Sequence, residues 1–306
     1  MASTSTTATV ADDVEAEAFK RLYPEQFFDR FLGEGVRPDG RPLGRARAVT
    51  IGAGAITSAD GSALVKVGRT SVLAGVRLEL IRPDETTPGQ GQLALNVELA
   101  PFSSPDYRPG RSATDAVSGV VEKLQAALLS GKDTVLLNTL CVAEGKAAWK
   151  AQLDVYVLDA DGCVTDAVLL ASIAALRNTR LPLVRNTKEG NYVPARRAEE
   201  GAAGLVEGCP RSVGLGRCPL ALTCCLYKQH VLVDPTADEE RLAECAVTVV
   251  VDQGGRLQGV YKAGGKVLAD AATLLKCTEA ARLRHKELSG LLEQSLQMGA
   301  EAAAER

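Results

Sequence analysis

The stretch Gln152–Asn178, QLDVYVLDADGCVTDAVLLASIAALRN, decides the fold, because it predicts a strand, a tight turn and a buried helix in direct succession. Apolar and more polar side chains alternate over residues 153–158, which is the two-residue period of a half-buried β-strand. The dipeptide Asp161-Gly162 then predicts a turn, because glycine adopts positive φ without steric cost. The next segment, AVLLASIAALRN, is apolar on nearly all sides, so we expect its helix to lie in the middle of the protein.

Four aspartates lie along this strand and turn: Asp154, Asp159, Asp161 and Asp166. One interpretation is an acid site, in which paired carboxylates carry protons or hold a metal ion. The other interpretation is structural. In it, Asp161 belongs to the turn, Thr165 or Asp166 caps the helix, and the remaining acids accept hydrogen bonds.

The composition is that of an ordinary globular protein, and 306 residues suffice for two domains or one large one. The formal net charge is −3, whereas a free-standing nucleic-acid binder is usually basic. Any contact with nucleic acid is therefore expected to use a local patch or an assembly. No apolar run reaches the about 20 residues needed to cross a bilayer, so no membrane partner is expected.

The eight cysteines form no CxxC pair and there are only two histidines, so neither a metal site nor another cofactor is expected. The N-terminus is rich in Ser, Thr and Ala, and it has neither the basic start nor the apolar core of a secretory signal. We therefore expect reduced thiols and a protein of the cytosol or the nucleus.

Upstream of the central strand, the sequence predicts a helical segment followed by a first domain. Residues 1–11 are of low complexity and are expected to be disordered, while residues 12–44 predict two amphipathic helices. The first domain is expected over residues 45–184, with a four-stranded β-meander, a helix and one further strand. The meander strands are expected at 48–56, 61–68, 70–80 and 92–102, with tight turns at Asp60-Gly61 and Gly68-Arg69, the helix at 113–131 and the further strand at 135–143.

Downstream, residues 185–217 are rich in Gly, Arg, Asn and Glu, which predicts a linker with irregular loops. A second domain is expected over residues 218–303, with strands, a short acidic helix, a hairpin and a long terminal helix. Strands followed by helices thus occur twice. The expected fold class is α+β, or mixed α/β, with two related halves.

Several separated motifs resemble the RNase PH family in their order and spacing, over nearly the whole chain. They are RPDGR (37–41), ADGSALVKVGRTSVLAGV (59–76), LDVYVLDADG (153–162), VDPTADEE (233–240) and ARLRHKEL (281–288). Within that family, LNTLCVAEGKAAW (137–149) resembles the ring subunits of the eukaryotic RNA exosome.

The resemblance implies an RNase PH-like fold of two β-α-β halves packed together, of the ribosomal protein S5 domain 2-like kind. It implies assembly with other RNase PH-like exosome subunits in a six-membered ring, with cap subunits that carry S1 and KH domains on one face. RNA would pass through the channel of this ring for 3′-to-5′ processing and degradation of ribosomal and messenger RNA. The implied locations are the nucleus, the nucleolus and the cytoplasm.

Two positions argue against catalysis by this chain. Active relatives carry a second carboxylate on the central strand where Tyr156 stands here, and a phenol with a pKa near 10 does not replace it at neutral pH. They also carry a phosphate-binding arginine where Gln125 stands here. The resemblance therefore predicts a degenerate catalytic site, made of Asp154, Tyr156, Asp161 and Gln125, in a non-catalytic subunit.

The alternative is a catalytically active, phosphate-dependent 3′-to-5′ exoribonuclease. In that case Asp154 and Asp161 form the acid pair and Lys123 holds the phosphate as a point charge.

The loop SSPDYRPGRS (103–112) is the candidate RNA-binding segment, because the resemblance places it at the central channel. The guanidinium groups of Arg108 and Arg111 can bind phosphate oxygens, and Tyr107 can stack on a base. The alternative is a solvated surface loop without RNA contact.

Overall fold

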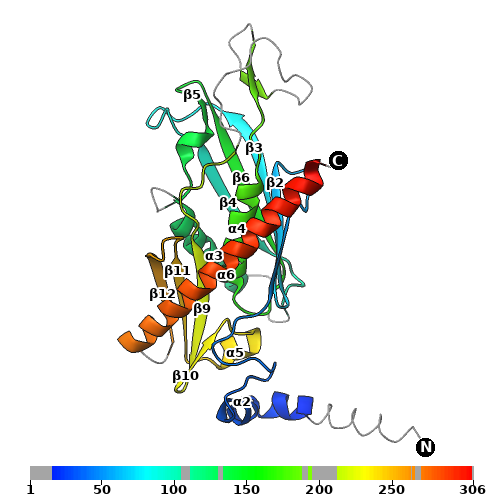
Figure 1. Ribbon diagram of the computed structural model, residues 1–306, viewed down its shortest axis with the longest axis vertical. Helices are drawn as coiled ribbons and strands as arrows, with labels where there is room; N and C mark the ends of the chain where they lie inside the picture. The colour runs from blue at the N-terminus through cyan, green and yellow to red at the C-terminus, as the bar shows by residue number, and fades with distance from the viewer. Residues whose placement is uncertain are drawn as a thin grey trace, which may run out of the picture.

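The computed structural model describes residues 16–104, 111–129, 134–187, 192–194, 212–262, 264–265 and 270–304, apart from the side chains of 111–116 and 302–304. Two β-sheets of several strands, with helices packed against them, form the body of the protein (Figure 1). This arrangement confirms the mixed α/β class. The segment 1–11, which is expected to be disordered, lies outside the described residues.

The larger sheet has the strand order β1-β2-β3-β6-β4, and β5 pairs with β6. The predicted meander is correct for the first three strands, which are antiparallel neighbours, but wrong for β4, which pairs in parallel with β6. Strand β6 takes the place beside β3 because its buried backbone needs partners on both edges. The strands are β1 (Val49–Ala53), β2 (Gly61–Val67), β3 (Thr70–Ile81), β4 (Gln92–Leu99), β5 (Cys141–Ala143) and β6 (Ala147–Asp159).

Strand β6 and the helix after it form the centre of the protein, as the sequence predicts. Leu153, Val155 and Val157 are buried, whereas Tyr156 among them is exposed. Helix α4 (Val164–Asn178) covers the buried face, and its residues 167–176 are all buried. The same helix also contacts the smaller sheet, so it lies between the two sheets.

The smaller sheet has the strand order β10-β9-β11-β12. Strand β9 is buried along its whole length because both of its faces are covered. Cys224 packs with Cys277 of helix α6 (Ala271–Ala304), while Tyr227 packs with Leu32 of helix α2 (Pro24–Gly33) on the other face. Figure 1 shows α6 running from this sheet to β1 of the larger one. The strands are β9 (Leu220–Tyr227), β10 (His230–Val233), β11 (Cys245–Val251) and β12 (Leu257–Lys262).

Two strand and turn predictions are wrong because distant contacts decide the local structure. The expected strand at 135–143 is a 3-10 helix, Leu137–Leu140, followed by β5, and the carbonyl of Leu137 accepts a hydrogen bond from the backbone of Gly91. Asp60-Gly61 is no tight turn, since residues 54–60 separate β1 from β2. At Gly61 a Cβ would lie 2.1 Å from Oγ1 of Thr179, so this glycine allows β2 to pack against the end of α4.

The predicted cap of α4 is also wrong. The helix begins at Val164, and its N-cap residue Cys163 has a positive φ of 51° and forms no side-chain cap. The carboxylate of Asp166 instead accepts hydrogen bonds from the backbone N–H and the hydroxyl of Thr223 in β9, at 2.6 and 2.9 Å. Asp166 therefore ties the central helix to the smaller sheet.

A buried ion pair joins the two sheets. Arg47 precedes β1 and Asp234 follows β10, and both are almost fully buried. Nη2 of Arg47 donates to Asp234 at 2.7 Å, and the backbone N–H of Arg47 donates to the same carboxylate at 2.7 Å. Burial alone would raise the pKa of Asp234, but the hydrogen bonds and charge of Arg47 hold it below its usual range. Arg284 of α6 completes the junction by donating to the carbonyl oxygen of Arg47 at 2.6 Å.

A second buried arginine lies beside this pair. Arg37, which is fully buried, donates to the carbonyl oxygens of Val233 at 2.6 Å and Leu43 at 2.7 Å. Its Nη1 lies 3.4 Å from the carboxylate of Glu239 in helix α5 (Ala237–Leu242). The motifs RPDGR and VDPTADEE are therefore in direct contact. We call Arg37, Arg47, Asp234 and Glu239 the buried arginine network.

We predict that Asp234→Asn destabilises the full chain by about 3 to 5 kcal/mol, because Arg47 then stays buried without its counter-charge. Asparagine suits the backbone, since Asp234 has a φ of 53° and asparagine tolerates this region. Urea unfolding followed by circular dichroism measures the difference. The control is Asp238→Asn, which removes an exposed partner of Lys20 and should cost less than about 1 kcal/mol. Equal unfolding midpoints for both variants would contradict the role of the pair.

We predict that the ionisation of Asp166 weakens the fold as the pH rises. Burial raises the pKa of Asp166 from 3.8 to about 7, although the hydrogen bonds from Thr223 act against this shift. The folded state therefore keeps the proton longer than the unfolded state, and stability falls between about pH 4 and pH 8. The variant Asp166→Asn has no carboxyl group to ionise here and so lacks this fall. The unfolding free energy of the variant minus that of the unaltered chain should therefore increase by a few kcal/mol as the pH rises through that window.

Urea unfolding at a series of pH values checks this prediction. Asp159→Asn serves as the matched control, because Asp159 is an exposed aspartate of the same turn region. The control should follow the unaltered chain at every pH. A stability difference between Asp166→Asn and the unaltered chain that does not change with pH would refute the prediction.

Candidate functional site

The open face of the larger sheet carries Asp154 and Tyr156 on β6. Asp154 pairs in register with Gly75 of β3 and Asn96 of β4, and its half-buried carboxylate accepts a long hydrogen bond of 3.4 Å from Asn96. The side chain of Tyr156 is 42% exposed. The phenol that stands at the expected position of a second carboxylate thus points away from the core.

Asp161 lies beyond the end of β6, in the turn before α4. Its carboxylate accepts a hydrogen bond of 3.2 Å from the backbone N–H of Ala237, and its own N–H donates to Oγ1 of Thr70 at 3.0 Å. The carboxylate also lies 3.9 Å from Nη1 of Arg47. Asp161 is therefore a turn residue tied to the start of α5. None of its contacts within the described residues includes Asp154.

Arg47 is the cation that contacts this turn, and its guanidinium is fully used by the protein. Nε and Nη2 donate to the carboxylate of Asp234, and Nη2 also reaches the carbonyl oxygen of Gly162 at 3.3 Å. Nη1 donates to the carbonyl oxygen of Asp161 and lies 3.5 Å from Oγ1 of Thr70. Each guanidinium nitrogen thus has an acceptor in the protein itself.

The N-terminus of α4 also holds an anion that belongs to the protein. Helix N-termini attract anions, because their first N–H groups have no partner in the helix. Here the backbone N–H of Cys163 donates to the carboxylate of Glu240 at 2.8 Å. Gly162 permits this close approach: it has a φ of 76°, and a Cβ there would lie 2.4 Å from the carbonyl oxygen of Pro235. Burial raises the pKa of Glu240, while the hydrogen bond from Cys163 and the charge of Arg47 lower it in part.

Gln125, the remaining member of the predicted degenerate site, lies on helix α3 (Arg111–Leu129). Gln125 and Glu122 are exposed, Lys123 is half-buried, and Leu124 between them is buried in the core. The charge of Glu122 adds to the effect of burial in raising the pKa of Tyr261 in β12. Within the described residues, neither Gln125 nor Lys123 contacts the aspartates of β6 and the turn.

The side chains of the three predicted RNA-binding residues lie outside the described part of the structure. Tyr107 and Arg108 lie outside the described residues. Arg111 is the first residue of α3, but its side chain also lies outside the described part. Their contact with RNA stays a prediction.

In the part of the chain that the structure describes, no group of three or more His, Cys, Asp or Glu side chains is arranged to hold a metal ion. Likewise, none of the described helices is both long and apolar enough to span a bilayer.

The sequence patterns do not predict the contact between Arg47 and Asp234 or the contact between Cys163 and Glu240. Arg47 and Asp234 are 187 residues apart, so no local period connects them. The sequence signal for these contacts is incomplete: Asp234 and Glu240 belong to the acidic motif VDPTADEE, whereas Arg47 lies outside the motifs of the resemblance.

Comparison with known proteins gives matches along most of the chain. Residues 45–182 match domain 1 of the 3′ exoribonuclease family, and residues 218–283 match its domain 2. The chain is 32% identical over 255 residues to the exosome complex component Rrp42 of Methanocella arvoryzae, which covers 83% of this chain and 88% of the relative. It is 36% identical over 231 residues to the Rrp42 component of Sulfurisphaera tokodaii, with coverage of 76% and 79%.

A solved structure agrees with these matches. The Archaeoglobus fulgidus exosome with RNA bound to the active site contains a chain with a TM-score of 0.70 and 26% identity, and the similarity covers 90% of this chain and 98% of that one. Both domains thus match in the expected order, and relatives above 30% identity extend over most of the chain. This protein therefore belongs to the 3′ exoribonuclease (RNase PH) family, and within it to the core components of the exosome.

Proposed function

We propose that this chain is a non-catalytic ring subunit of an RNA exosome that helps to form the RNA channel. The observation that carries the proposal is that each guanidinium nitrogen of Arg47 already has an acceptor within the protein. Phosphorolysis needs a cation that is free to hold phosphate near an acid that moves the proton. The arginine that contacts Asp161 donates from every guanidinium nitrogen to groups of the protein itself, so it holds the fold rather than a phosphate.

Two further features support a non-catalytic role. Tyr156 stands where active relatives carry a carboxylate, and its side chain faces solvent. The N–H of Cys163 at the start of α4, where an incoming phosphate would find donors, is bonded to Glu240. Acid, cation and helix N-terminus are thus present in this region, but each already has a structural partner.

The partners and roles of the chain follow from its relatives. They are named exosome complex components, and one solved relative contains RNA, which supports assembly with other RNase PH-like subunits around an RNA path. We propose a six-membered ring with S1 and KH cap subunits, a role in ribosomal RNA processing and messenger RNA turnover, and locations in the nucleus, nucleolus and cytoplasm. We propose that the chain takes the ring position of the ribosomal-RNA-processing protein 43 type, although the archaeal relatives compared above are named Rrp42.

An active phosphorolytic exoribonuclease is the second candidate. Lys123 favours it, since this half-buried cation has no carboxylate partner among the described residues. The positions of the acids speak against it, because Asp154 bonds to Asn96 and Asp161 bonds to Ala237. An acid pair needs both carboxylates at one reacting group.

We predict that Asp154→Ala leaves phosphate-dependent RNA degradation by the assembled complex unchanged within about two-fold, because this carboxylate takes no part in proton transfer. The release of nucleoside diphosphates from a labelled RNA measures the rate. Lys123→Ala tests the alternative in the same assay. A loss of ten-fold or more in either variant, with the complex still assembled, would establish this chain as the active subunit.

We predict that the chain, isolated from its source with its bound proteins, has the native mass of a ring of several different RNase PH-like subunits. A self-sufficient RNase PH should instead form a homo-oligomer of one chain. Native mass spectrometry of the purified complex, followed by identification of its subunits, distinguishes the two. A homo-hexamer as the main species would overturn the proposed role.

A further inference from the structure

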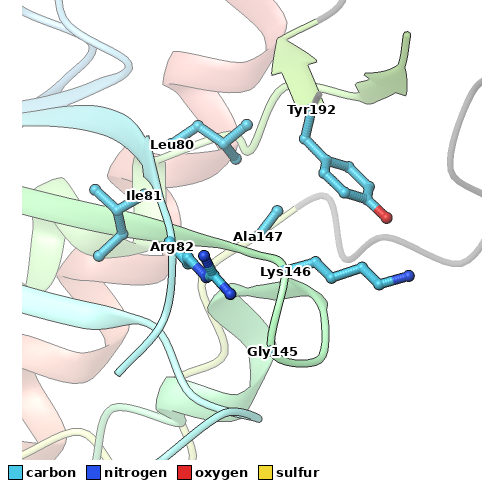
Figure 2. Close-up of a pocket in the computed structure, with 7 residues that line it drawn as sticks. All are labelled: Leu80, Ile81, Arg82, Gly145, Lys146, Ala147 and Tyr192. Atoms are coloured by element: carbon cyan, nitrogen blue, oxygen red, sulfur yellow. The ribbon is translucent and has the colours of Figure 1, made fainter. Parts of the chain in front are cut away.

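A hollow of about 380 Å³ opens at the C-terminal end of β3 (Figure 2). The other end of this strand, at Thr70, contacts Arg47 of the buried arginine network. Three separate segments meet there: the residues that end and follow β3, the turn before β6, and the first residue of β8 (Tyr192–Pro194). The hollow is lined by Leu80, Ile81, Arg82, Gly145, Lys146, Ala147 and Tyr192.

Two exposed cations lie at this hollow. Arg82 and Lys146 are exposed, and neither forms an ion pair or hydrogen bond with another described residue. The acids two residues away from these cations are directed elsewhere. The carboxylate of Glu144 lies next to Gly89, and its charge adds to burial in raising the pKa of Cys141. The carboxylate of Asp84 accepts a hydrogen bond of 3.0 Å from the side-chain amide of Gln92. The chain as a whole carries a net charge of −3, so any nucleic-acid contact is expected to use local cations such as these two.

The other walls of the hollow are apolar and aromatic. Leu80 and Ile81 are half-buried and present aliphatic surface, and the ring of Tyr192 is half-buried. In Figure 2 the side chains of Lys146 and Tyr192 extend toward the same open side of the hollow. Its volume falls within the range of about 300 to 1,000 Å³ that is typical of small-molecule pockets.

We propose that this hollow binds one nucleotide of single-stranded RNA. The base lies against Tyr192 and Leu80, since aromatic side chains stack on any base, and the phosphodiester contacts Arg82 and Lys146. An acidic peptide would use the two cations but would gain little from the exposed part of an aromatic ring beside an aliphatic wall, so RNA fits the set better. The inference rests on the proposed function, because it assigns an RNA contact to the same subunit.

Binding of a fluorescent single-stranded oligouridylate to the full chain tests the hollow. Arg82→Ala combined with Lys146→Ala should weaken binding and lower the slope of log affinity against log salt concentration by about 0.7 for each lost phosphate contact. Tyr192→Ala should weaken binding about five-fold or more through lost stacking, whereas Tyr192→Phe keeps the ring and should bind as the unaltered chain does.

The matched control is Lys276→Ala combined with Lys286→Ala. It removes the same charge from two exposed lysines of α6, so it separates a local contact from a change in net charge. Equal weakening by both double variants, or no weakening by Tyr192→Ala, overturns the proposal. Circular dichroism confirms that each variant is folded.

Photocrosslinking in the assembled complex locates the contact. RNA that carries 4-thiouridine should form adducts with the peptides that contain Lys146 or Tyr192, and the Arg82/Lys146 variant should lose these adducts while the α6 control keeps them. Protection of the hollow by a partner subunit in the absence of RNA would show a protein contact instead and overturn the proposal.

The outcomes separate this inference from the proposed function. If the complex assembles and binds RNA without adducts at the hollow, the hollow proposal fails and the ring role stands. If the chain forms a homo-hexamer or degrades RNA with phosphate by itself, the ring role fails, and the binding assay on the full chain still decides whether the hollow contacts RNA.

Discussion

The ion pair between Arg47 and Asp234 is the interaction on which the rest of the structure depends. Both side chains are almost fully buried, so each would carry a desolvation cost of several kcal/mol without the other. One partner precedes the first strand of the larger sheet, and the other follows a strand of the smaller sheet. Arg284 of α6 bonds to the same arginine, so two sheets and the terminal helix meet at one point. The relative position of the sheets is therefore fixed by charge as well as by apolar packing.

This junction also explains the acids around the central strand. Arg47 bonds to the carbonyl oxygen of Asp161, so the turn before α4 belongs to the same junction. Asp161 then holds the start of α5 and Asp166 holds β9, which leaves each carboxylate with its own partner. A catalytic pair needs two acids directed at one reacting group and a cation with free donors. In this fold the carboxylates of Asp161 and Asp166 and the guanidinium group of Arg47 all take part in structural contacts.

The parts of the fold that follow from local periodicity are predictable from the sequence, and the rest depends on distant contacts. The alternation of β6, the buried length of α4 and the turn at Gly68, with its φ of 58°, are all local properties. The parallel pairing of β4 with β6 is not local, because a loop and a helix separate the two strands. Asp166 looks like a cap in the sequence since its true partner, Thr223, lies in the other half of the chain. The site residues follow the same rule: the exposure of Tyr156 is predictable from the strand period, whereas the bonds of Arg47 and Glu240 are not.

Two positions of the predicted degenerate site, 156 and 125, make no demand on the RNase PH fold. Position 156 points out of the sheet, so a carboxylate and a phenol fit there equally well, and the core is unaffected by the choice. Gln125 is exposed on α3, and an arginine at that position would likewise make no demand on packing. The residues that do hold the fold, such as Gly162 with its close approach to Pro235, lie beside these positions but are separate from them. Residues at these exposed positions can therefore change while the buried junction remains intact.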